Sequence, residues 1–369
     1  MLRQSGLQRP YERSQPLSIE DLVLDEPGPG ELRVKVRAAG LCHSDLSVID
    51  GSRPRPVPMA IGHEGAGIVE ELGSQVAGFA PGDHVVFSFV PMCGRCAYCL
   101  SGTSALCENG ARSNAAGTLL GGDIRLHGRD GERVHHHLGV SAFSETVVVS
   151  AASCVRVDPD VPLAIAALFG CALMTGVGAV LNTARVEAGS SVAVFGLGGV
   201  GLSTVMGARL AGAHPILAID RIPAKLELAE QLGATHGLLA AEGVAARIKD
   251  LTRGGVDYAF EAVGNAGVMA EAYEATRRGG KTVAIGLPHP DQKLTIPAVS
   301  IVAEGRQIIG SYMGSAVPVR DVPRLMALYR AGKLPVDALR SATLALEDLN
   351  AAFDLLASGE TVRQVLLLD

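Results

Sequence analysis

Apolar residues in the first 150 positions follow a pattern that predicts strands. Residues 31–40 (ELRVKVRAAG) alternate with a period of two, and further short apolar runs next to glycine-containing turns cover residues 65–73, 82–89 and 143–150. Such runs predict a β-rich domain with loop insertions. The glycine-rich stretch 110–139 contains three consecutive histidines at 135–137 and is predicted to be a long exposed loop.

The pattern changes near residue 190, where short apolar runs alternate with helical segments. We predict strands over 190–196, 214–220, 256–264 and 281–287 and helices over 198–212, 223–233 and 268–280. This alternation predicts parallel βαβ units in a doubly wound sheet, so the fold class is α/β. The tail is mixed, with predicted helices over 321–334 and 346–359 and a last strand over 361–369.

Length and charge narrow the class of protein. A chain of 369 residues favours two domains, and a net charge of −6 without a basic run argues against nucleic acid as a partner. Residues 161–182 carry no charge and could span a bilayer, but their glycines and the lack of basic flanks favour a buried helix over a membrane span. The N-terminal residues lack the apolar core of a secretory signal. Seven cysteines, an odd number, then favour reduced thiols in the cytoplasm.

Three glycines point to a dinucleotide. Gly196, Gly198 and Gly201 form G-x-G-x-x-G between a predicted strand and a predicted helix, and Asp220 ends the next strand. The first glycine allows a tight turn, the second admits a pyrophosphate, and the third lets helix and strand pack closely. A carboxylate at Asp220 favours NAD over NADP, although the adjacent Arg221 could accommodate a 2′-phosphate. The alternative is a glycine-rich packing turn with a surface Asp.

Four cysteines crowd into residues 93–107 (CGRCAYCLSGTSALC). Together they could surround one tetrahedral zinc ion in a closed, structural site; the alternatives are a redox pair in CGRC or disulfides. Cys42, Cys154 and Cys171 remain. Cys42, His63 and Cys171 could form a catalytic Cys₂His zinc site, but separations of 21 and 108 residues do not identify it, and buried core residues are equally compatible.

The whole set of motifs resembles the zinc-dependent long-chain alcohol dehydrogenases of the medium-chain dehydrogenase/reductase superfamily. The resemblance lies in AAGLCHSD, GHEGAGIVEELG, CGRCAYC with Cys107, FGCALMTGVGAVLNTA, VAVFGLGGVGLS, GGVDYAFEAVG and VRQVLL, which run nearly end to end. It implies a GroES-like catalytic domain from residues 1–172 and 313–369, with a structural zinc lobe at 93–107. It also implies a Rossmann NAD-binding domain at 173–312 and a homodimer.

The resemblance also implies two zinc ions per chain. The catalytic ion would be held by Cys42, His63 and Cys171, the structural one by Cys93, Cys96, Cys99 and Cys107, and Cys154 would be a core thiol. Ser44 matches the hydroxyl that takes the alcohol proton, Asp45 the carboxylate that orients the zinc-bound histidine, and Glu64 a carboxylate behind the zinc. Many members end the proton relay with a histidine where this chain has Ser47, so we expect the proton to leave through Ser44, the nicotinamide ribose and water.

The implied reaction is hydride transfer between a zinc-bound alkoxide of a primary alcohol and NAD, giving the aldehyde. Cofactor-binding positions implied by the family are His43, Thr175, Gly196, Gly198, Gly199, Val200, Gly201, Asp220, Arg221, Lys225 and Arg363. Phe89, Phe143 and Leu287 match positions that line the substrate pocket and suggest a bulky or aryl alcohol; a bland alternative is that the two phenylalanines only close the core.

A sub-branch of this family oxidises the formaldehyde–glutathione adduct. Residues 52–61 (SRPRPVPMAI) lack the carboxylates that hold this adduct, and Arg112 is displaced by one position from the anion-binding arginine of that branch. A thiol-adduct dehydrogenase is therefore the second choice. A zinc-containing regulator that binds nucleic acid would need a basic surface, whereas this chain has a net charge of −6. A zinc-free relative would lack Cys42 and Cys171, whereas this chain has both.

Overall fold

The computed structural model describes residues 1–368 and divides into two compact units. Unit 1 consists of Met1–Cys171, Val317–Met326 and the chain from Val336 onward, and unit 2 of Ala172–Ala316 and Ala327–Pro335. Helix α12 (Pro318–Arg330) spans one of the boundaries. The domain limits expected from the resemblance stay a prediction.

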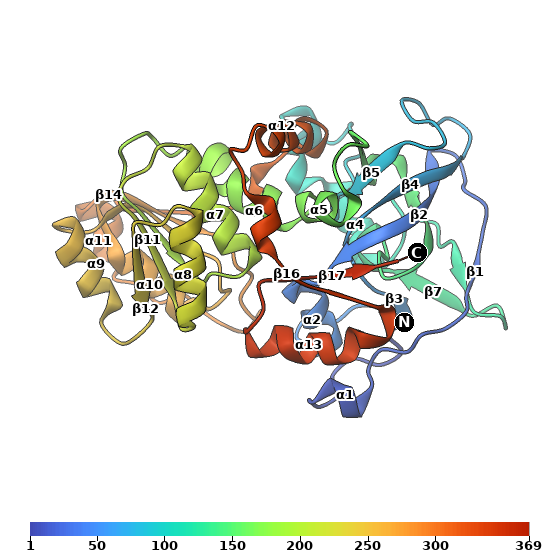
Figure 1. The fold of residues 1–369 in the computed structure, drawn as a ribbon, viewed down its shortest axis with the longest axis horizontal. Coiled ribbons are helices and arrows are strands. Elements are labelled where there is room, and N and C mark those ends of the chain that lie inside the picture. Colours follow the sequence, from blue (N-terminus) through green and yellow to red (C-terminus); the bar gives the residue numbers. More distant parts are fainter. Residues whose placement is uncertain (369) are drawn as a thin grey trace. The chain divides into compact units, whose positions relative to one another are not determined.

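Unit 2 is built on a six-stranded sheet in the order β12-β11-β10-β13-β14-β15, in which every pair is parallel. The chain moves outward from β10 to β12 and then returns to β13 on the other side of β10. Because crossovers between parallel strands are right-handed, this reversal puts helices on both faces of the sheet (Figure 1). The strand order is that of a dinucleotide-binding fold, with the ligand expected where the order reverses. The prediction of a doubly wound sheet is confirmed.

The strands of unit 2 are short; the three in the middle of the sheet are mostly buried, as expected where helices cover both faces, whereas the two edge strands are largely exposed. The six strands are β10 (Val192–Phe195), β11 (Ile216–Asp220), β12 (His236–Leu239), β13 (Val256–Glu261), β14 (Thr276–Ala284) and β15 (Gln307–Gly310). The helices are α6 (Ala172–Gly178), continued by a π-helical turn over Ala179–Ala184, then α7 (Gly199–Leu210), α8 (Pro223–Leu232), α9 (Val244–Thr252), α10 (Ala266–Ala275) and α11 (Ala298–Ala303).

Unit 1 is β-rich, as the alternation in its sequence predicts. Its large sheet runs β16-β17-β2-β4-β5-β9, with β8 paired to β2, and a smaller sheet runs β1-β6-β7-β3. The strands are β1 (Val23–Leu24), β2 (Glu31–Gly40), β3 (Met59–Ala60), β4 (Glu64–Leu72), β5 (His84–Phe87), β6 (Leu126–His127), β7 (Arg133–His136), β8 (Thr146–Ser150), β9 (Cys154–Val157), β16 (Arg340–Leu344) and β17 (Arg363–Leu367).

Short helices connect these strands: α1 (Tyr11–Ser14), α2 (His43–Ile49), α3 (Ala97–Leu100), α4 (Glu108–Ala116), α5 (Leu163–Ala166) and α13 (Leu349–Ser358). One core cluster joins the inner faces of β2, β4, β5 and β8 to α2 and α13; Leu32, Val34 and Phe353 in it are fully buried. This single cluster explains why the chain from Val336 onward packs with the first 171 residues.

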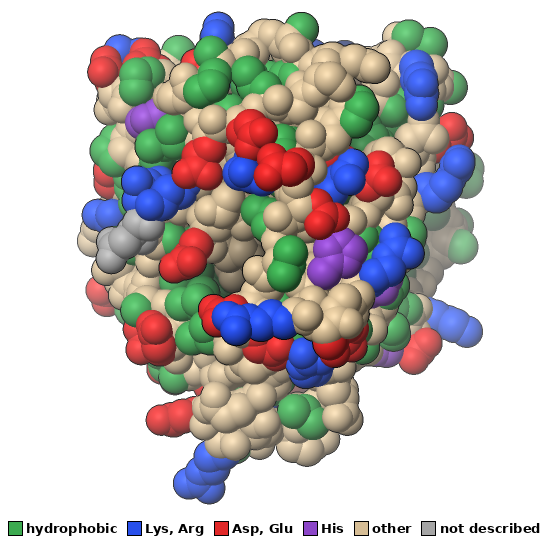
Figure 2. Space-filling model, turned by 90° about the vertical axis from the view of Figure 1, so that its right-hand side faces the viewer, with side chains coloured by type: hydrophobic (Ala, Val, Ile, Leu, Met, Phe, Trp, Pro, Cys, Tyr) green, Lys and Arg blue, Asp and Glu red, His purple; other side chains and the backbone are tan. Residues whose placement is uncertain are grey.

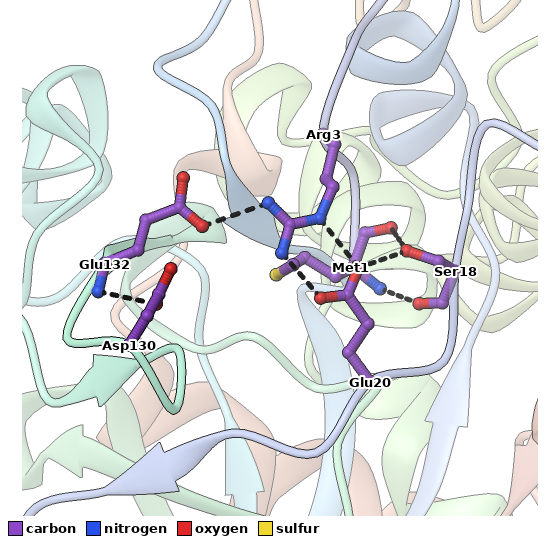
Figure 3. Close-up of polar contacts among 6 residues, drawn as sticks. All are labelled: Met1, Arg3, Ser18, Glu20, Asp130 and Glu132. Atoms are coloured by element: carbon purple, nitrogen blue, oxygen red, sulfur yellow. Dashed lines mark hydrogen bonds and ion pairs between the residues drawn. The ribbon is translucent and has the colours of Figure 1, made fainter.

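The first residues of the chain are tied to the smaller sheet by ion pairs. Arg3 donates both to Glu20, at 2.7 and 2.9 Å, and to Glu132, at 3.0 Å (Figure 3). The side chain of Arg3 is 51% exposed and that of Glu132 39%, and Figure 2 shows acidic and basic side chains interspersed on the face that it views. Pairs this exposed add little stability, so they guide the course of the N-terminal segment more than they hold the fold.

Three predicted elements need correction. The stretch 110–139 is not one exposed loop. Its residues up to Ala116 belong to α4, the strands β6 and β7 follow, and His136 and His137 are buried. The helix predicted over 268–280 ends at Ala275, because Thr276 pairs with Val256 and begins β14. The single helix predicted over 161–182 is broken into several helical segments, though its residues are mostly buried as expected. Within residues 1–368 no single helix has the length and hydropathy of a membrane span; only the bent pair Leu163–Phe169 and Ala172–Ala184 passes together.

Candidate active site and zinc centres

The strand register of unit 1 brings Cys42 and His63 together although 21 residues separate them. Gly40, the last residue of β2, pairs with Glu64, the first residue of β4. Cys42 follows two positions later as the N-cap of α2, and His63 directly precedes β4. A Cβ on Gly40 would overlap the Glu64 carboxylate, so glycine at this position leaves room for that carboxylate. The sheet therefore sets the thiol beside the imidazole.

Cys171 reaches the same place through a second close approach. It follows Gly170, where a Cβ would overlap the carbonyl oxygen of Phe87 in β5. The ligand atoms of Cys42, His63, Glu64 and Cys171 all lie within 4.8 Å of one another, and all four residues are buried. Two thiols and an imidazole at this separation are the donor set of a catalytic zinc site, so these residues fit zinc.

Asp45 holds the His63 imidazole from behind. Its Oδ1 lies 2.8 Å from His63 Nδ1, and its Oδ2 accepts a hydrogen bond from the Cys42 backbone N–H at 3.1 Å. Because His63 Nδ1 faces a carboxylate, this nitrogen carries the proton and leaves Nε2 as the ligand atom. Burial alone would raise the pKa of Asp45, but the two imidazoles beside it, His63 and His137, lower it below its ordinary value. Asp45 therefore remains an anion in a site without solvent.

The charges around the cluster favour a thiolate. The pKa of the Cys42 thiol is held well below its usual range, chiefly by a hydrogen bond with Cys171 and then by the positive charges of Arg363 and His63. Burial raises the pKa of Glu64 to about 7. Neither carboxylate oxygen of Glu64 has a hydrogen-bond partner; the guanidinium of Arg363 comes within 3.4 Å of Oε1. A buried carboxylate without a directed donor suits a neighbouring cation.

The four clustered cysteines form a second site within residues 93–107. Their sulfur atoms all lie within 4.8 Å of one another. Cys107 caps α4 by accepting from the N–H of Gly110 at 3.4 Å. Burial opposes ionisation of Cys93, but the N–H of Arg95 and the Asn109 side chain outweigh it and lower its pKa to about 6. Four sulfurs in this arrangement fit a tetrahedral ion with no open position, a structural site.

The glycine loop of unit 2 has the geometry of a phosphate-binding turn. Gly196 has a φ of +88°, and a Cβ on Gly201 would overlap the Gly196 carbonyl oxygen. By contrast, a Cβ on Gly198 would meet nothing within 4 Å. Asp220 is fixed above this loop, because its Oδ2 accepts from the N–H of Leu197 at 2.7 Å and its Oδ1 from the N–H of Ile222 at 3.0 Å. The loop therefore leaves space at Gly198, at the N-terminus of α7, where a pyrophosphate would bind.

Three further predicted cofactor-binding residues have buried side chains. Lys225 is buried, and burial lowers its pKa although Asp220 opposes the shift. Thr175 is buried in α6. The guanidinium of Arg363 is buried beside Glu64 and donates to the Leu41 carbonyl oxygen at 2.6 Å. The expected contact of Arg363 with a pyrophosphate stays a prediction, as do the roles of His43, Gly199, Val200 and Arg221.

The candidate substrate residues are placed differently from one another. Phe89 packs edge-on against the His63 imidazole, with ring centroids 5.5 Å apart. Phe143 packs against Phe353 and lines a cavity of about 830 Å³ together with residues of the N-terminal segment. Leu287, in unit 2, is 53% exposed. Of the predicted pocket residues, Phe89 is thus the one in direct contact with a candidate zinc ligand.

The two serines of the expected proton relay lie on α2. Ser44 lies 3.8 Å from the Cys42 sulfur, and Ser47 donates to the His43 carbonyl oxygen at 2.8 Å.

One residue beside the candidate site, His137, was not predicted from the sequence. His137, predicted as part of an exposed loop, is 1% exposed and its Nδ1 lies 3.2 Å from Asp45 Oδ1. No local pattern distinguishes this histidine, since residues 133–140 read RVHHHLGV without a regular alternation of apolar and polar positions.

Comparisons with known proteins place this geometry in a family. Residues 28–159 match the "Alcohol dehydrogenase GroES-like domain" and residues 199–331 the "Zinc-binding dehydrogenase" domain. The "Alcohol dehydrogenase class-3" of Myxine glutinosa is 40% identical over 97% of this chain and 96% of its own, and the "S-(hydroxymethyl)glutathione dehydrogenase" of Paracoccus denitrificans is 37% identical over 96% and 97%. The structure of benzyl alcohol dehydrogenase from Acinetobacter calcoaceticus superposes with a TM-score of 0.89 at 34% identity, over 94% of each chain. The chain therefore belongs to the zinc-dependent alcohol dehydrogenase family and is an NAD-dependent oxidoreductase with zinc and NAD as its cofactors.

Proposed function

We propose that this chain transfers a hydride between a bulky or aryl primary alcohol and NAD, giving the aldehyde. The observation that carries the proposal is the buried cluster of Cys42, His63 and Cys171, with Asp45 behind His63 and Phe89 packed against its ring. We assign these two thiols and this imidazole as ligands of the catalytic zinc. Zinc in such a site polarises an alcohol or carbonyl oxygen and so favours hydride transfer.

The residues of the chain supply orientation and proton transfer. Asp45 fixes the imidazole of His63 in the tautomer that presents Nε2. The Ser44 hydroxyl, next to Cys42 at the start of α2, takes the alcohol proton and passes it on to the ribose and to water, since Ser47 replaces the histidine that ends this relay in many relatives. Ser47 cannot replace that histidine as a base, because a neutral hydroxyl is far less basic than an imidazole; its hydrogen is donated to the carbonyl oxygen of His43.

The cofactor selection is assigned to unit 2. Gly196, Gly198 and Gly201 receive the pyrophosphate, and Asp220 accepts hydrogen bonds from the adenosine ribose. Asp220 is suited to this because two backbone N–H groups hold its carboxylate in place and so reduce the entropy that binding must remove. A 2′-phosphate at this position would be repelled, which supports NAD over NADP.

The substrate class rests on the surroundings of His63. The Phe89 ring at 5.5 Å offers an apolar wall, and the benzyl alcohol dehydrogenase named above is a structural relative. The second candidate, a thiol-adduct dehydrogenase, is favoured by the class-3 and S-(hydroxymethyl)glutathione relatives. Against it stands the segment 52–61, whose only charged residues are Arg53 and Arg55, so it offers no carboxylate to the cationic end of a glutathione adduct.

A substrate panel decides between the two. The zinc-loaded enzyme is assayed for NAD reduction with ethanol, longer primary alcohols, benzyl and cinnamyl alcohol, and a formaldehyde–glutathione mixture. We expect kcat/KM to be highest for the aryl alcohols. Turnover of the glutathione adduct alone would reverse the order of the two candidates, and no turnover of either class would refute the proposal.

We also infer that the enzyme is a homodimer joined through unit 2. Strand β15 is one of the two edge strands of the six-stranded sheet, and Ile308 on it is 37% exposed. On the preceding helix α11, Val299 is 72% and Val302 87% exposed. An unpaired edge beside exposed apolar side chains favours pairing with a second copy. Sedimentation of the purified enzyme at twice the mass of the chain would support this, and a monomer would refute it. A cytoplasmic location stays a prediction.

A further inference from the structure

The histidine run at 135–137 has no role in the proposed reaction, yet two of its members are buried. His136 is a structural residue: its Nε2 accepts from the backbone N–H of Arg125 at 3.1 Å, and its Nδ1 faces the Ser141 hydroxyl at 3.4 Å. His137 begins the 3₁₀ turn that follows β7 and points elsewhere, to Asp45. The two neighbouring histidines therefore serve different parts of unit 1.

Asp45 receives two imidazoles on one oxygen atom. Oδ1 lies 2.8 Å from His63 Nδ1 and 3.2 Å from His137 Nδ1. The two rings are nearly perpendicular, at 89°, with centroids 5.7 Å apart. Asp45 is fully buried, so water does not compete for its oxygens, and its Oδ2 is occupied by the Cys42 N–H. Both oxygens of this carboxylate are thus in contact with polar groups of the protein.

The contact between His137 Nδ1 and Asp45 Oδ1 is short, but it is not linear. The distance of 3.2 Å is within reach of a hydrogen bond, whereas the direction of the N–H falls short of a well-aligned one. A neutral imidazole carries its proton on one nitrogen only, and a lone pair on Nδ1 facing the carboxylate would be repelled. The proton therefore sits on Nδ1, and its positive end faces Oδ1. The contact is an electrostatic restraint on the carboxylate rather than a full second hydrogen bond.

We propose that His137 is a positioning residue of the catalytic centre: its Nδ1–H edge fixes the carboxylate of Asp45 and thereby orients the zinc ligand His63. This inference rests on the proposed function, which assigns His63 as a ligand. Partners that orient a metal-bound histidine typically change metal affinity or activity 10–100-fold when removed. His137 acts one contact further away, so we expect an effect near the lower end of that range.

A different reading makes His137 itself a ligand. The donor atoms of Asp45, His63 and His137 also lie within 4.8 Å of one another. A metal ion between them would need a lone pair on His63 Nδ1. That nitrogen carries the proton when Nε2 serves as the ligand atom, so both ions cannot share one neutral imidazole. The trio therefore suits hydrogen bonding to the carboxylate and not a second cation beside the first.

The test measures how fast a chelator removes zinc from the loaded enzyme, with no substrate present. His137→Phe keeps the ring and removes the donor, while His137→Asn places an amide N–H near the position of Nδ1. His135→Phe is the matched control, because it makes the same change two residues earlier, on β7, at a residue without a contact to Asp45 among the described residues. The zinc held by the four cysteines of residues 93–107 provides an internal reference in each protein.

We expect His137→Phe to speed the release of one of the two zinc ions about tenfold and to leave the other unchanged. The rate of zinc release from His137→Asn should stay within about twofold of the wild-type rate, and the rate from His135→Phe should equal the wild-type rate. Zinc release from His137→Phe at the wild-type rate would show that the ring only fills space. A third zinc ion in the wild-type enzyme that both variants lack would show that His137 is a ligand. Either result overturns the proposal. If His137→Phe does not fold, His137→Gln replaces it, since its amide reaches the position of Nε2 instead of Nδ1.

An activity measurement separates this inference from the proposed function. His137→Phe should lower kcat for alcohol oxidation while the KM for NAD stays the same, because the glycine loop of unit 2 is untouched. A wild-type enzyme that oxidises no alcohol would refute the proposed function, whereas the zinc-release comparison would still decide the role of His137.

Discussion

Asp220 offers the sharpest test of how the cofactor is selected. Its carboxylate accepts from the N–H groups of Leu197 and Ile222 and has lone pairs left for the ribose hydroxyls. Asp220→Asn keeps the shape and removes the charge. A hydrogen bond to a charged acceptor is worth about 1.5–3 kcal/mol and one to a neutral acceptor about 0.5–1.5 kcal/mol. The loss of about 1–1.5 kcal/mol corresponds to roughly a tenfold rise in the KM for NAD.

The same substitution should admit NADP. The two charges of a 2′-phosphate about 5 Å from the carboxylate are repelled by about 1.7 kcal/mol in a water-like dielectric. Removing that repulsion adds a further factor of roughly ten or more, so the ratio of kcat/KM for NAD to that for NADP should fall about 100-fold. The assay is steady-state reduction of each cofactor with one alcohol. Asp250→Asn, the same change at an exposed residue of α9, is the control and should leave NAD kinetics unchanged.

A folded Asp220→Asn enzyme that still prefers NAD to within twofold of the wild-type ratio would refute this reasoning. The melting temperature must be measured in parallel, since the amide nitrogen of Asn cannot accept from Leu197 or Ile222 and one backbone N–H loses its partner.

Three further predictions concern other residues. Gly198→Ala should raise the KM for NAD without lowering the melting temperature, because its Cβ meets only open space, whereas Gly201→Ala should destabilise unit 2 because its Cβ overlaps the Gly196 carbonyl oxygen; equal effects on stability would contradict this. Ser44→Ala should lower alcohol oxidation strongly, and a pH–rate profile close to that of wild type would rule out its role in the relay. Burial lowers the pKa of His136 to about 3, against about 6.5 when unfolded, so only the unfolded state binds this proton between these values. The contribution of His136 to the free energy of unfolding should thus be fully present above pH 6.5 and should fall by a few kcal/mol as the pH drops towards 3. Denaturant titrations of His136→Gln should show a weaker dependence of this free energy on pH.

The parts of the site that the sequence predicts are those whose signal is local. Gly196, Gly198 and Gly201 lie within six positions, between a strand and a helix, and the structure confirms that arrangement. The four cysteines of residues 93–107 are also close in sequence, so one loop can gather them. Both motifs carry their geometry in their spacing.

The catalytic cluster is different, because the sheet of unit 1 creates it. Cys42 and His63 meet through the register of β2 with β4, and Cys171 arrives through the approach of Gly170 to β5. Spacing contains none of this information, so only the resemblance to a family singled these residues out. His137 was missed for a related reason: a run of histidines has the composition of a loop, and its burial depends on Asp45, a partner 92 positions away.

The proposed reaction moves hydride from the C1 carbon of a bulky primary alcohol to NAD. The most direct measurement uses the zinc-loaded enzyme with NAD and benzyl alcohol that carries two deuterium atoms on its C1 carbon, followed by mass spectrometry of the reduced cofactor. We expect one deuterium in each reduced nicotinamide and a slower rate than with unlabelled alcohol. Reduced cofactor without deuterium, or no reduced cofactor from enzyme that holds two zinc ions, would contradict it.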